Sequence, residues 1–299
     1  MSGNKKIIMT NTAVLLTVFN RREVTLAGLR TLRKAISKMP LEYHFDIFMT
    51  NDGCSDGTAE AVSNEFPDIK IISGDGTLFW SGGMRKAWTA AIEYSKYDFF
   101  LWFNDDAMLY EDALQILFET SKNVKTNSVI SGAFCDDQGC VSYGGKTKNW
   151  KIIAPKAGEY QSIYWMNGNL VLVPRDVYEQ IGMIDRIFVH GKGDYDYGRR
   201  AIKAGFSVYL TDSYVGETNR HDNPRQTPYQ KGIGIYDRMK ILYSPRHSPI
   251  TAFVFCKRHI GLITAMRVFI QSNLKAMFPQ MNILIYKLGK RKRDVIDKI

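Results

Sequence analysis

The sequence contains no long hydrophobic run. No stretch reaches the roughly 18 apolar residues that a transmembrane helix needs, so we expect no membrane-spanning segment. The opening residues, Met-Ser-Gly-Asn-Lys-Lys, lack the apolar core of a secretory signal. Together these absences predict a cytoplasmic protein.

Cysteine is scarce, with four residues among 299. Cys135 and Cys140 are five positions apart, which is not a usual spacing for zinc ligands, and no paired Cys or His motif accompanies them. The pattern argues against a zinc site and predicts reduced thiols.

The positive charge is concentrated at one end of the chain. Residues 256–299 carry ten Lys or Arg and two acids, so this segment holds +8 of the net charge of +10. The rest of the chain is close to neutral, which argues against a nucleic-acid-binding body. The segment 256–299 is instead expected to meet an anionic surface.

Apolar runs alternate with helical patterns through the first half of the chain. This order predicts a mostly parallel α/β sheet with helices on both faces, and ligands bind beyond the carboxyl ends of such strands. The predicted strands are 13–19, 45–50, 70–73 and 99–103, and the predicted helices are 24–37, 59–65, 84–95 and one from about 111.

The second half is less regular. Strands are predicted over 128–134, 170–173 and 207–210, with helices from about 175 and over 195–203. We expect one domain over residues 1–255, with one half over about 1–125 and another over about 126–255, which the family resemblance described below implies to be nucleotide-binding and acceptor-binding. Residues 256–299 form a basic, amphipathic, helical extension.

Within that extension, apolar residues recur at helical spacing, namely Ile263, Met266, Ile270, Leu274 and Met277. Pro279 ends the helix, and a basic run follows over 290–293. An amphipathic helix beside a basic cluster favours an anionic membrane surface. The alternative is a helix packed on the domain with a solvated charged end.

The most informative segment is 99–103 with the residues that follow it. Five apolar residues lead directly into Asn104-Asp105-Asp106. Carboxylates at the end of a buried strand are costly unless they hold a positive group, and a hard divalent cation that bridges to a substrate phosphate suits them. The alternative is a simple acidic turn.

Six motifs, taken in order, resemble the family-2 inverting glycosyltransferases, which have the GT-A fold. The resemblance covers roughly residues 12–225 and is strongest to bacterial rhamnosyltransferase-like and galactofuranosyltransferase-like members. The motifs are Thr17-Val-Phe-Asn-Arg21, Asn51-Asp-Gly-Cys-Ser-Asp-Gly-Thr58, the segment 76–87, Asn104-Asp105-Asp106, Asn167-Gly168-Asn169 and the segment 191–200.

The resemblance implies a donor site for a UDP- or dTDP-sugar. In it, Asn51 or Asp52 accepts the N3–H of a pyrimidine base, and glycines before the helix at Met84 allow backbone to approach the ligand. Asp52 alternatively stabilises its turn. The implied donor residues are Thr17, Asn20, Arg21, Asn51, Asp52, Gly82, Gly83, Arg85, Asn104 and Asp105.

The resemblance also implies a divalent metal, Mn or Mg. Asp106 is the main candidate ligand, Asn104 is a weaker one because it is neutral, and His221 is a third, from a late polar loop. A solvated His221 is the alternative, and His190 is the competing histidine.

Asp194 is the candidate catalytic base, since it can take the proton of the attacking acceptor hydroxyl. It alternatively caps the helix that follows. Asp196 is expected either to bind an acceptor hydroxyl or to pair with Arg199 or Arg200. Sugar contacts are expected from Trp80, Trp165, Asn167 and Gly168, with Trp102 assigned to the core.

The sequence departs from the family pattern at three acidic positions, where it has Asn51, Asn104 and Gly193. The Q-x-x-R-W motif of processive synthases is absent, which favours addition of one sugar or a short run.

We therefore expect a metal-dependent inverting glycosyltransferase of surface polysaccharide assembly. Its acceptor is a glycan or lipid-linked glycan, and it works peripherally at the inner face of the cytoplasmic membrane. The alternatives are a degenerate sugar-nucleotide- or glycan-binding protein and a sugar-phosphate nucleotidyltransferase. The second is disfavoured because Asn20-Arg21-Arg22 lacks glycine after the first strand. The sequence leaves the oligomeric state open.

Overall fold

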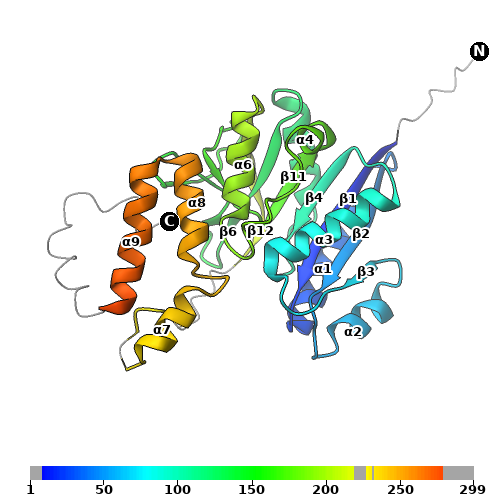
Figure 1. Ribbon diagram of the computed structural model, residues 1–299. Helices are drawn as coiled ribbons and strands as arrows, with labels where there is room; N and C mark the ends of the chain where they lie inside the picture. The colour runs from blue at the N-terminus through cyan, green and yellow to red at the C-terminus, as the bar shows by residue number, and fades with distance from the viewer. Residues whose placement is uncertain (1–8, 219–226, 231, 279–299) are drawn as a thin grey trace, which may run out of the picture.

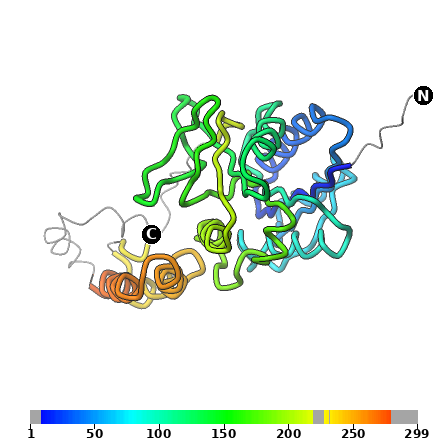
Figure 2. The backbone as a smooth tube through the Cα atoms, turned by 90° about the horizontal axis from the view of Figure 1, so that it is seen from above, coloured from blue at the N-terminus to red at the C-terminus, as the bar shows by residue number. Residues whose placement is uncertain are grey.

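The computed structural model describes residues 9–218, 227–230 and 232–278. A curved central sheet lies between two layers of helices, and a third group of helices, at the C-terminal end of the described chain, lies against one side (Figure 1). Seen from above, these C-terminal helices lie beside α6 (Gly193–Lys203) and away from the first strands (Figure 2).

The main sheet has the strand order β3-β2-β1-β4-β11-β6-β12-β5, with β7 paired to β6. All of these pairs are parallel except those of β11, β5 and β7. The strands are β1 (Thr10–Val18), β2 (Tyr43–Asn51), β3 (Lys70–Ser73), β4 (Phe99–Phe103), β5 (Met108–Leu109), β6 (Val129–Cys135), β7 (Val141–Tyr143), β11 (Leu170–Pro174) and β12 (Val208–Glu217). The mostly parallel α/β prediction is confirmed.

A small antiparallel sheet joins β10 (Trp165–Met166), β8 (Gly145–Lys146) and β9 (Ile152–Ile153). It occupies the irregular stretch of the second half, where the sequence predicts loops and short β elements.

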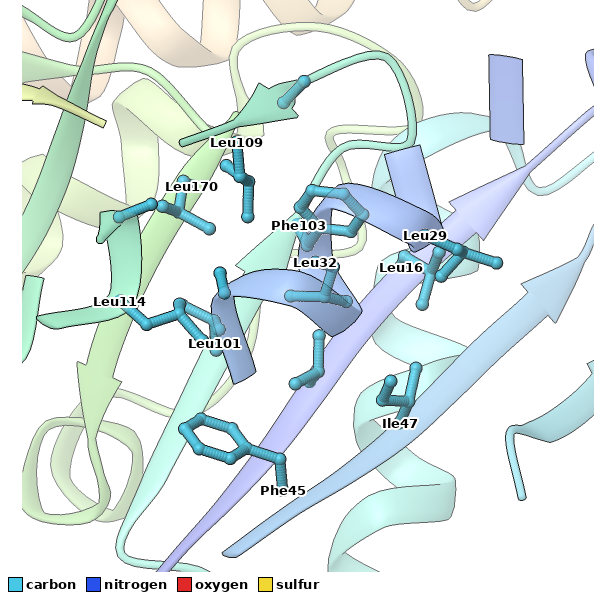
Figure 3. Packing of buried hydrophobic residues seen from close by; sticks show 14 of the residues in the cluster. Leu16, Leu29, Leu32, Phe45, Ile47, Leu101, Phe103, Leu109, Leu114 and Leu170 are labelled. Carbon is cyan, nitrogen blue, oxygen red and sulfur yellow. The ribbon is translucent and has the colours of Figure 1, made fainter. Parts of the chain in front are cut away.

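One face of the main sheet is covered by α1 (Arg22–Ser37), α2 (Thr58–Glu65) and α4 (Ala113–Asn123). Leucines of α1 and α4 meet alternate residues of β1, β2 and β4 in one apolar cluster, part of which Figure 3 shows from close by. These strands are buried on both faces, as expected for parallel strands between helices.

The other face is covered by α3 (Phe79–Tyr94), α5 (Arg175–Ile181) and α6. Trp88 and Trp102 are at the centre of this second cluster and are fully buried. The prediction that Trp102 belongs to the core is confirmed.

The carboxyl ends of β1, β2 and β4 meet at one edge of the sheet. Val18 pairs with Asn51, and Phe103 is the last residue of β4. Because β11 runs antiparallel to β4, Leu170 pairs with Phe103, and the residues just before Leu170 lie at the same edge. The topology therefore brings the segments after β1, β2 and β4 and the segment before β11 to one place.

Helices α7 (Ile235–Leu242) and α8 (Pro249–His259) are absent from the predictions, whereas α9 (Leu262–Met277) matches the predicted amphipathic helix. The predicted boundary between residues 255 and 256 falls inside α8. Phe255 and Cys256 pack against Trp165 and Phe188, so this helix is part of the folded body. The basic run 290–293 lies outside the described residues.

In the part of the chain that the structure describes, no helix combines the length and apolar character needed to cross a membrane. All four cysteines are free thiols in the structure.

Candidate active site

Two adjacent carboxylates follow β4 at the edge where the strands end. Asp105 is 1% exposed, and it is held by Arg21 from the β1–α1 turn and by the Thr25 hydroxyl, which donates to Asp105 Oδ2 at 2.7 Å. Burial raises the pKa of Asp105 to about 6, against the opposing effect of Arg21. Arg21 is thus the cation that balances this pair of acids.

Asp106 is the more accessible of the two carboxylates, with 19% of its side chain exposed. Arg21 Nη1 donates to Asp106 Oδ2 at 2.9 Å, so one guanidinium joins both acids. The pKa of Arg21 is raised, because the two carboxylates outweigh the effect of its burial. The carboxylate oxygens of Asp105 and Asp106, which lie beside the long side chain of Arg21, are ligands that suit a hard divalent cation.

The described residues contain no cluster of three or more His, Cys, Asp or Glu side chains arranged to hold a metal. His221, the predicted third ligand, lies outside them. Its role stays a prediction.

Asn104 connects the β4 edge to the second half of the chain. Its Oδ1 accepts from Trp80 Nε1 at 2.7 Å, and its Nδ2 donates to Asn169 Oδ1 at 2.8 Å. These two bonds position Trp80 and Asn169 beside the acidic pair. The metal-ligand role predicted for Asn104 would have to use the remaining lone pair of the same oxygen.

Asp194 lies in the first turn of α6, on the opposite side of this connection. Its Oδ1 accepts from the Tyr195 N–H at 2.8 Å and its Oδ2 from the Gly168 N–H at 3.2 Å. Burial raises the pKa of Asp194 above its ordinary value. The helix begins at Gly193, so Asp194 is inside it and is not its cap.

Gly168 is the point of contact between Trp80 and Asp194. A Cβ at this position would lie 2.8 Å from the Trp80 ring and 3.3 Å from Asp194 Cβ. Beside it, Asn167 Oδ1 is buried and has no hydrogen-bond partner among the described residues. The predicted sugar contacts Trp80, Asn167 and Gly168 are therefore gathered next to Asp194.

Asp196 has a different environment, although it is two residues from Asp194. It is fully buried and accepts from Arg200 Nε at 2.8 Å, while His259 Nε2 lies 2.8 Å and Arg258 Nη1 3.3 Å from its Oδ1. The predicted pairing with Arg200 is confirmed. The alternative, contact with an acceptor hydroxyl, is not supported, because both oxygens are enclosed by groups that join α6 to α8.

The acidic loop after β2 folds on itself. Asp52 is buried, and its carboxylate accepts backbone N–H groups of Gly76, Leu78 and Phe79 at 2.9–3.3 Å. This geometry supports the turn-stabilising alternative for Asp52. Asn51 Oδ1 accepts from the Cys54 N–H at 2.9 Å and is partly exposed at the edge of the sheet.

The segment after β1 carries the remaining predicted donor residues. Asn20 has a φ of 48°, and its Oδ1 accepts from the Ser55 N–H at 2.8 Å, which ties this turn to the loop after β2. Thr17, three residues earlier on β1, lies against Gly83 of α3.

Helix α3 begins at Phe79, before the predicted start at Met84, because Asp52 fixes the backbone that enters it. Gly82 and Gly83 are therefore in the helix and buried. A Cβ at Gly83 would lie 2.0 Å from Thr17 Oγ1, so this glycine allows α3 to approach β1. Gly83 thus has a packing role, and the predicted approach of Gly82 and Gly83 to a ligand stays a prediction.

Two other predicted contacts have structural partners. Arg85 donates to the carbonyls of Asp185 and Phe188, both at 3.2 Å, rather than facing the β4 edge. Trp165 is 2% exposed and stacks on Trp150 with ring centroids 4.4 Å apart. Trp165 is thus part of the core that holds α8, and the predicted sugar contact is corrected.

The structure gives contacts for Asn169, Lys192 and Gly193, to which the sequence assigned no role in the site. Asn169 is the partner of Asn104, and its signal was its place beside Gly168 in the Asn-Gly-Asn motif. Lys192 lies in the turn before α6, and burial lowers its pKa while Asp194 and Cys256 oppose that shift. Gly193 has Ser81 Oγ 2.7 Å from its Cβ position, which explains why the Glu of the family pattern is absent there.

The buried contacts of Asp196 generate a stability prediction. Asp196→Asn should lower the free energy of unfolding by about 3 kcal/mol, since it removes the buried counter-charge of Arg200, whereas Arg258 keeps its ion pair with Asp185 at 2.7 Å. The hydrogen bonds of His259 and Arg200 hold the pKa of Asp196 below 3.8 despite its burial. Its ionised form therefore stabilises the fold above pH 3.8, and urea titrations should show the variant and wild type converging as the pH falls below that value.

Asp194→Asn is the matched control on the same helix. Because the pKa of Asp194 is raised, its ionised form does not stabilise the fold, and this variant should unfold within about 1 kcal/mol of wild type. Equal losses in the two variants would contradict the assignment of separate roles.

Comparison with known proteins gives the family. The model for glycosyl transferase family 2 matches residues 13–181. No curated protein matches the chain at a significant level.

Solved structures with the same fold include the following three. Mannosyltransferase PcManGT from Pyrobaculum calidifontis, in complex with GDP-Man and Mn2+, is 13% identical with a TM-score of 0.54, over 94% of this chain and 75% of that one. S. aureus TarS 1–349 is 11% identical with a TM-score of 0.56, over 97% and 95%. GalNAc-T7 with UDP, GalNAc and Mn2+ is 12% identical with a TM-score of 0.55, over 97% and 59%.

At these identities the structures support the fold alone, and the family rests on the match to more than half of the chain. The fold is of the GT-A type, and the chain belongs to glycosyltransferase family 2.

Proposed function

We propose that the protein is a metal-dependent inverting glycosyltransferase of bacterial surface polysaccharide biosynthesis. It moves rhamnose, galactofuranose or another hexose from a UDP- or dTDP-sugar to a glycan acceptor. One observation carries the proposal. The acidic pair after β4 and Asp194 on α6 flank one connected group, in which Asn104 holds Trp80 and Asn169, and Trp80 meets Gly168 beside Asp194.

The donor belongs on the β4 side. Asp106, with Asp105 and with His221 as the predicted third ligand, would hold the divalent cation, which neutralises charge on the leaving diphosphate when bound. Arg21 already balances the two acids and would be released toward the phosphates. Two of the similar structures were solved with Mn2+ and with GDP-Man or UDP, which supports a nucleotide-sugar donor and manganese.

The acceptor belongs on the Asp194 side. Its hydroxyl oxygen attacks the anomeric carbon as the bond from that carbon to the diphosphate oxygen breaks, and the hydroxyl proton passes to an Asp194 carboxylate oxygen. A single displacement inverts the anomeric configuration. The raised pKa of Asp194 makes it a better proton acceptor, and the bonds from Gly168 and Tyr195 fix its orientation.

A catalytically degenerate binding protein is the second candidate. It is favoured by the neutral residues at Asn51, Asn104 and Gly193, each of which has a structural place here. It shares donor binding with the first candidate and differs from it in turnover.

The role of Asp194 is the sharpest test between these candidates. Asp194→Asn keeps the side-chain shape and removes the base, so transfer should fall about 100-fold or more while donor affinity changes little. Transfer from labelled donor and binding by calorimetry measure the two quantities.

Asp137→Asn, which changes an exposed carboxylate on the β6–β7 turn, is the control and should keep full activity. Undiminished transfer in Asp194→Asn would contradict the base assignment. Donor binding without turnover in the wild type, across a panel of acceptors, would favour the degenerate protein.

The outer face of α9 supports the peripheral membrane placement. Ile263, Met266 and Ile270 are 86%, 51% and 50% exposed, whereas Ala265 and Val268 on the opposite face are buried. An unpaired apolar stripe next to basic residues suits insertion at an anionic lipid surface, with the segment 256–299 as the contact.

Vesicle flotation tests this placement. The triple variant Ile263→Gln, Met266→Gln, Ile270→Gln should reduce binding to phosphatidylglycerol vesicles about tenfold or more, because it removes the apolar contact. High salt should weaken the wild type as well.

Leu41→Gln is the matched control. Leu41 is 93% exposed, but it lies between α1 and β2, far in the sequence from α9. Equal binding of the triple variant and the control would contradict membrane docking through α9.

A further inference from the structure

A large cavity lies between the start of α3 and the C-terminal helices. Its volume is about 790 Å³. Phe79 forms one wall, and α7 with the turn that follows it forms the other, through Ile241, Lys240, Arg246 and His247. Among the residues that the structure describes, none of the predicted donor or metal residues lines this cavity.

Phe79 connects the cavity to the transfer centre. The next residue, Trp80, is held by Asn104 and meets Gly168, which donates to Asp194. The His190 ring meets Phe79 edge-on with ring centroids 5.7 Å apart, just before the segment that leads into α6. The cavity wall is therefore one residue away from the group that reaches Asp194, and through the Phe79 N–H it also contacts Asp52 of the loop after β2.

The backbone at Phe79 is fixed in an unusual conformation. Its φ is 53°, a region that bulky residues rarely adopt, and the Asp52 carboxylate holds its N–H at 2.9 Å. Strained backbone of this kind is kept where a side chain must be presented in one place. Here the conformation is accompanied by an aromatic side chain in the cavity wall.

The chemistry of the walls is mixed. Among the described lining residues, Lys240, Arg246 and His247 are basic and Asp237 is acidic. Phe79, Ile233, Ile241 and Pro245 supply apolar surface. Cationic donors beside an apolar wall match a ligand that carries phosphate on a hydrocarbon chain.

The wall formed by α7 continues toward the exposed stripe. Tyr243, at the end of α7, donates through its hydroxyl to Asn273 Oδ1 on α9 at 2.9 Å. A ligand anchored in lipid at α9 would therefore approach the cavity from the α7 side.

We propose that this cavity binds the diphosphate and first hydrocarbon units of a lipid-linked acceptor, with Lys240 and Arg246 as the phosphate contacts. The proposal rests on the proposed function, and it adds the acceptor class and the residues that select it. It places the acceptor's phosphates on the side of Asp194, opposite the donor's diphosphate at Asp106.

Calorimetry on the full chain tests the proposal with farnesyl diphosphate as the probe, below its micelle concentration. The probe should bind at least about tenfold more tightly than farnesol, since charged donors contact the phosphates. The double variant Lys240→Gln, Arg246→Gln should lose about tenfold in affinity for the probe, while its affinity for UDP with Mn2+ stays within about twofold.

Lys257→Gln is the matched control, because Lys257 is an exposed lysine on the neighbouring helix α8 and does not line the cavity. It should bind the probe like wild type. Equal affinity in the double variant, or an equal loss in the control, would overturn the proposal.

Competition with UDP shows whether the cavity binds the phosphates of the acceptor or those of the donor. If the double variant loses UDP affinity as much as probe affinity, or if UDP displaces the probe, the cavity serves the donor and the proposal is overturned. Failure of the proposed function is distinguishable, because there the wild type binds no nucleotide whether or not it binds farnesyl diphosphate.

Discussion

The contact of Arg21 with Asp105 and Asp106 is the interaction on which the rest of the site depends. Asp105 and Asp106 follow a buried strand, and the Arg21 guanidinium, which pairs with both, compensates their negative charge there. Thr25 and the close approach of α1, whose Gly28 has its Cβ position 2.2 Å from the Asp105 carbonyl, fix the turn.

From this turn the arrangement extends by short polar links. Asn104 forms hydrogen bonds with Trp80 and Asn169, and the neighbouring Gly168 donates its N–H to Asp194. The donor-side acids and the candidate base are thus held by elements that come from distant parts of the chain. This frame keeps the acidic pair Asp105 and Asp106 apart from Asp194.

Helix α6 separates two carboxylates by their surroundings. Asp194 accepts hydrogen bonds from the backbone N–H groups of Gly168 and Tyr195, and burial raises its pKa, whereas hydrogen bonds from His259 and Arg200 lower the pKa of Asp196. The second carboxylate anchors α8, and with it the layer that carries α7 and the exposed face of α9. The helical layer is therefore attached within two residues of the candidate base.

Much of the fold was predictable, because parallel strands buried on both faces appear as continuous apolar runs such as 13–19 and 99–103. The acidic pair was predictable for the same reason, since it follows such a run. The positions of strand ends in a parallel sheet then bring the motifs together.

Other features depend on contacts between distant segments. The start of α3 is set by Asp52, which has no local sequence signal, so Gly82 and Gly83 were assigned to a loop. The burial of Trp165 requires α8, and the partners of Asp196 include Arg258 and His259, more than sixty positions away. A single sequence does not show which polar residues such packing will enclose.

The most direct measurement of the central claim is nucleotide binding by thermal shift, with wild type and Asp106→Asn, against UDP, dTDP, GDP and CMP in Mn2+, Mg2+ or EDTA. A ligand that binds only the folded state raises the melting temperature. The account predicts stabilisation by UDP or dTDP that requires the metal and is lost in Asp106→Asn. No shift with any nucleotide, or an equal shift in EDTA and in the variant, would contradict a metal-bridged donor at the end of β4.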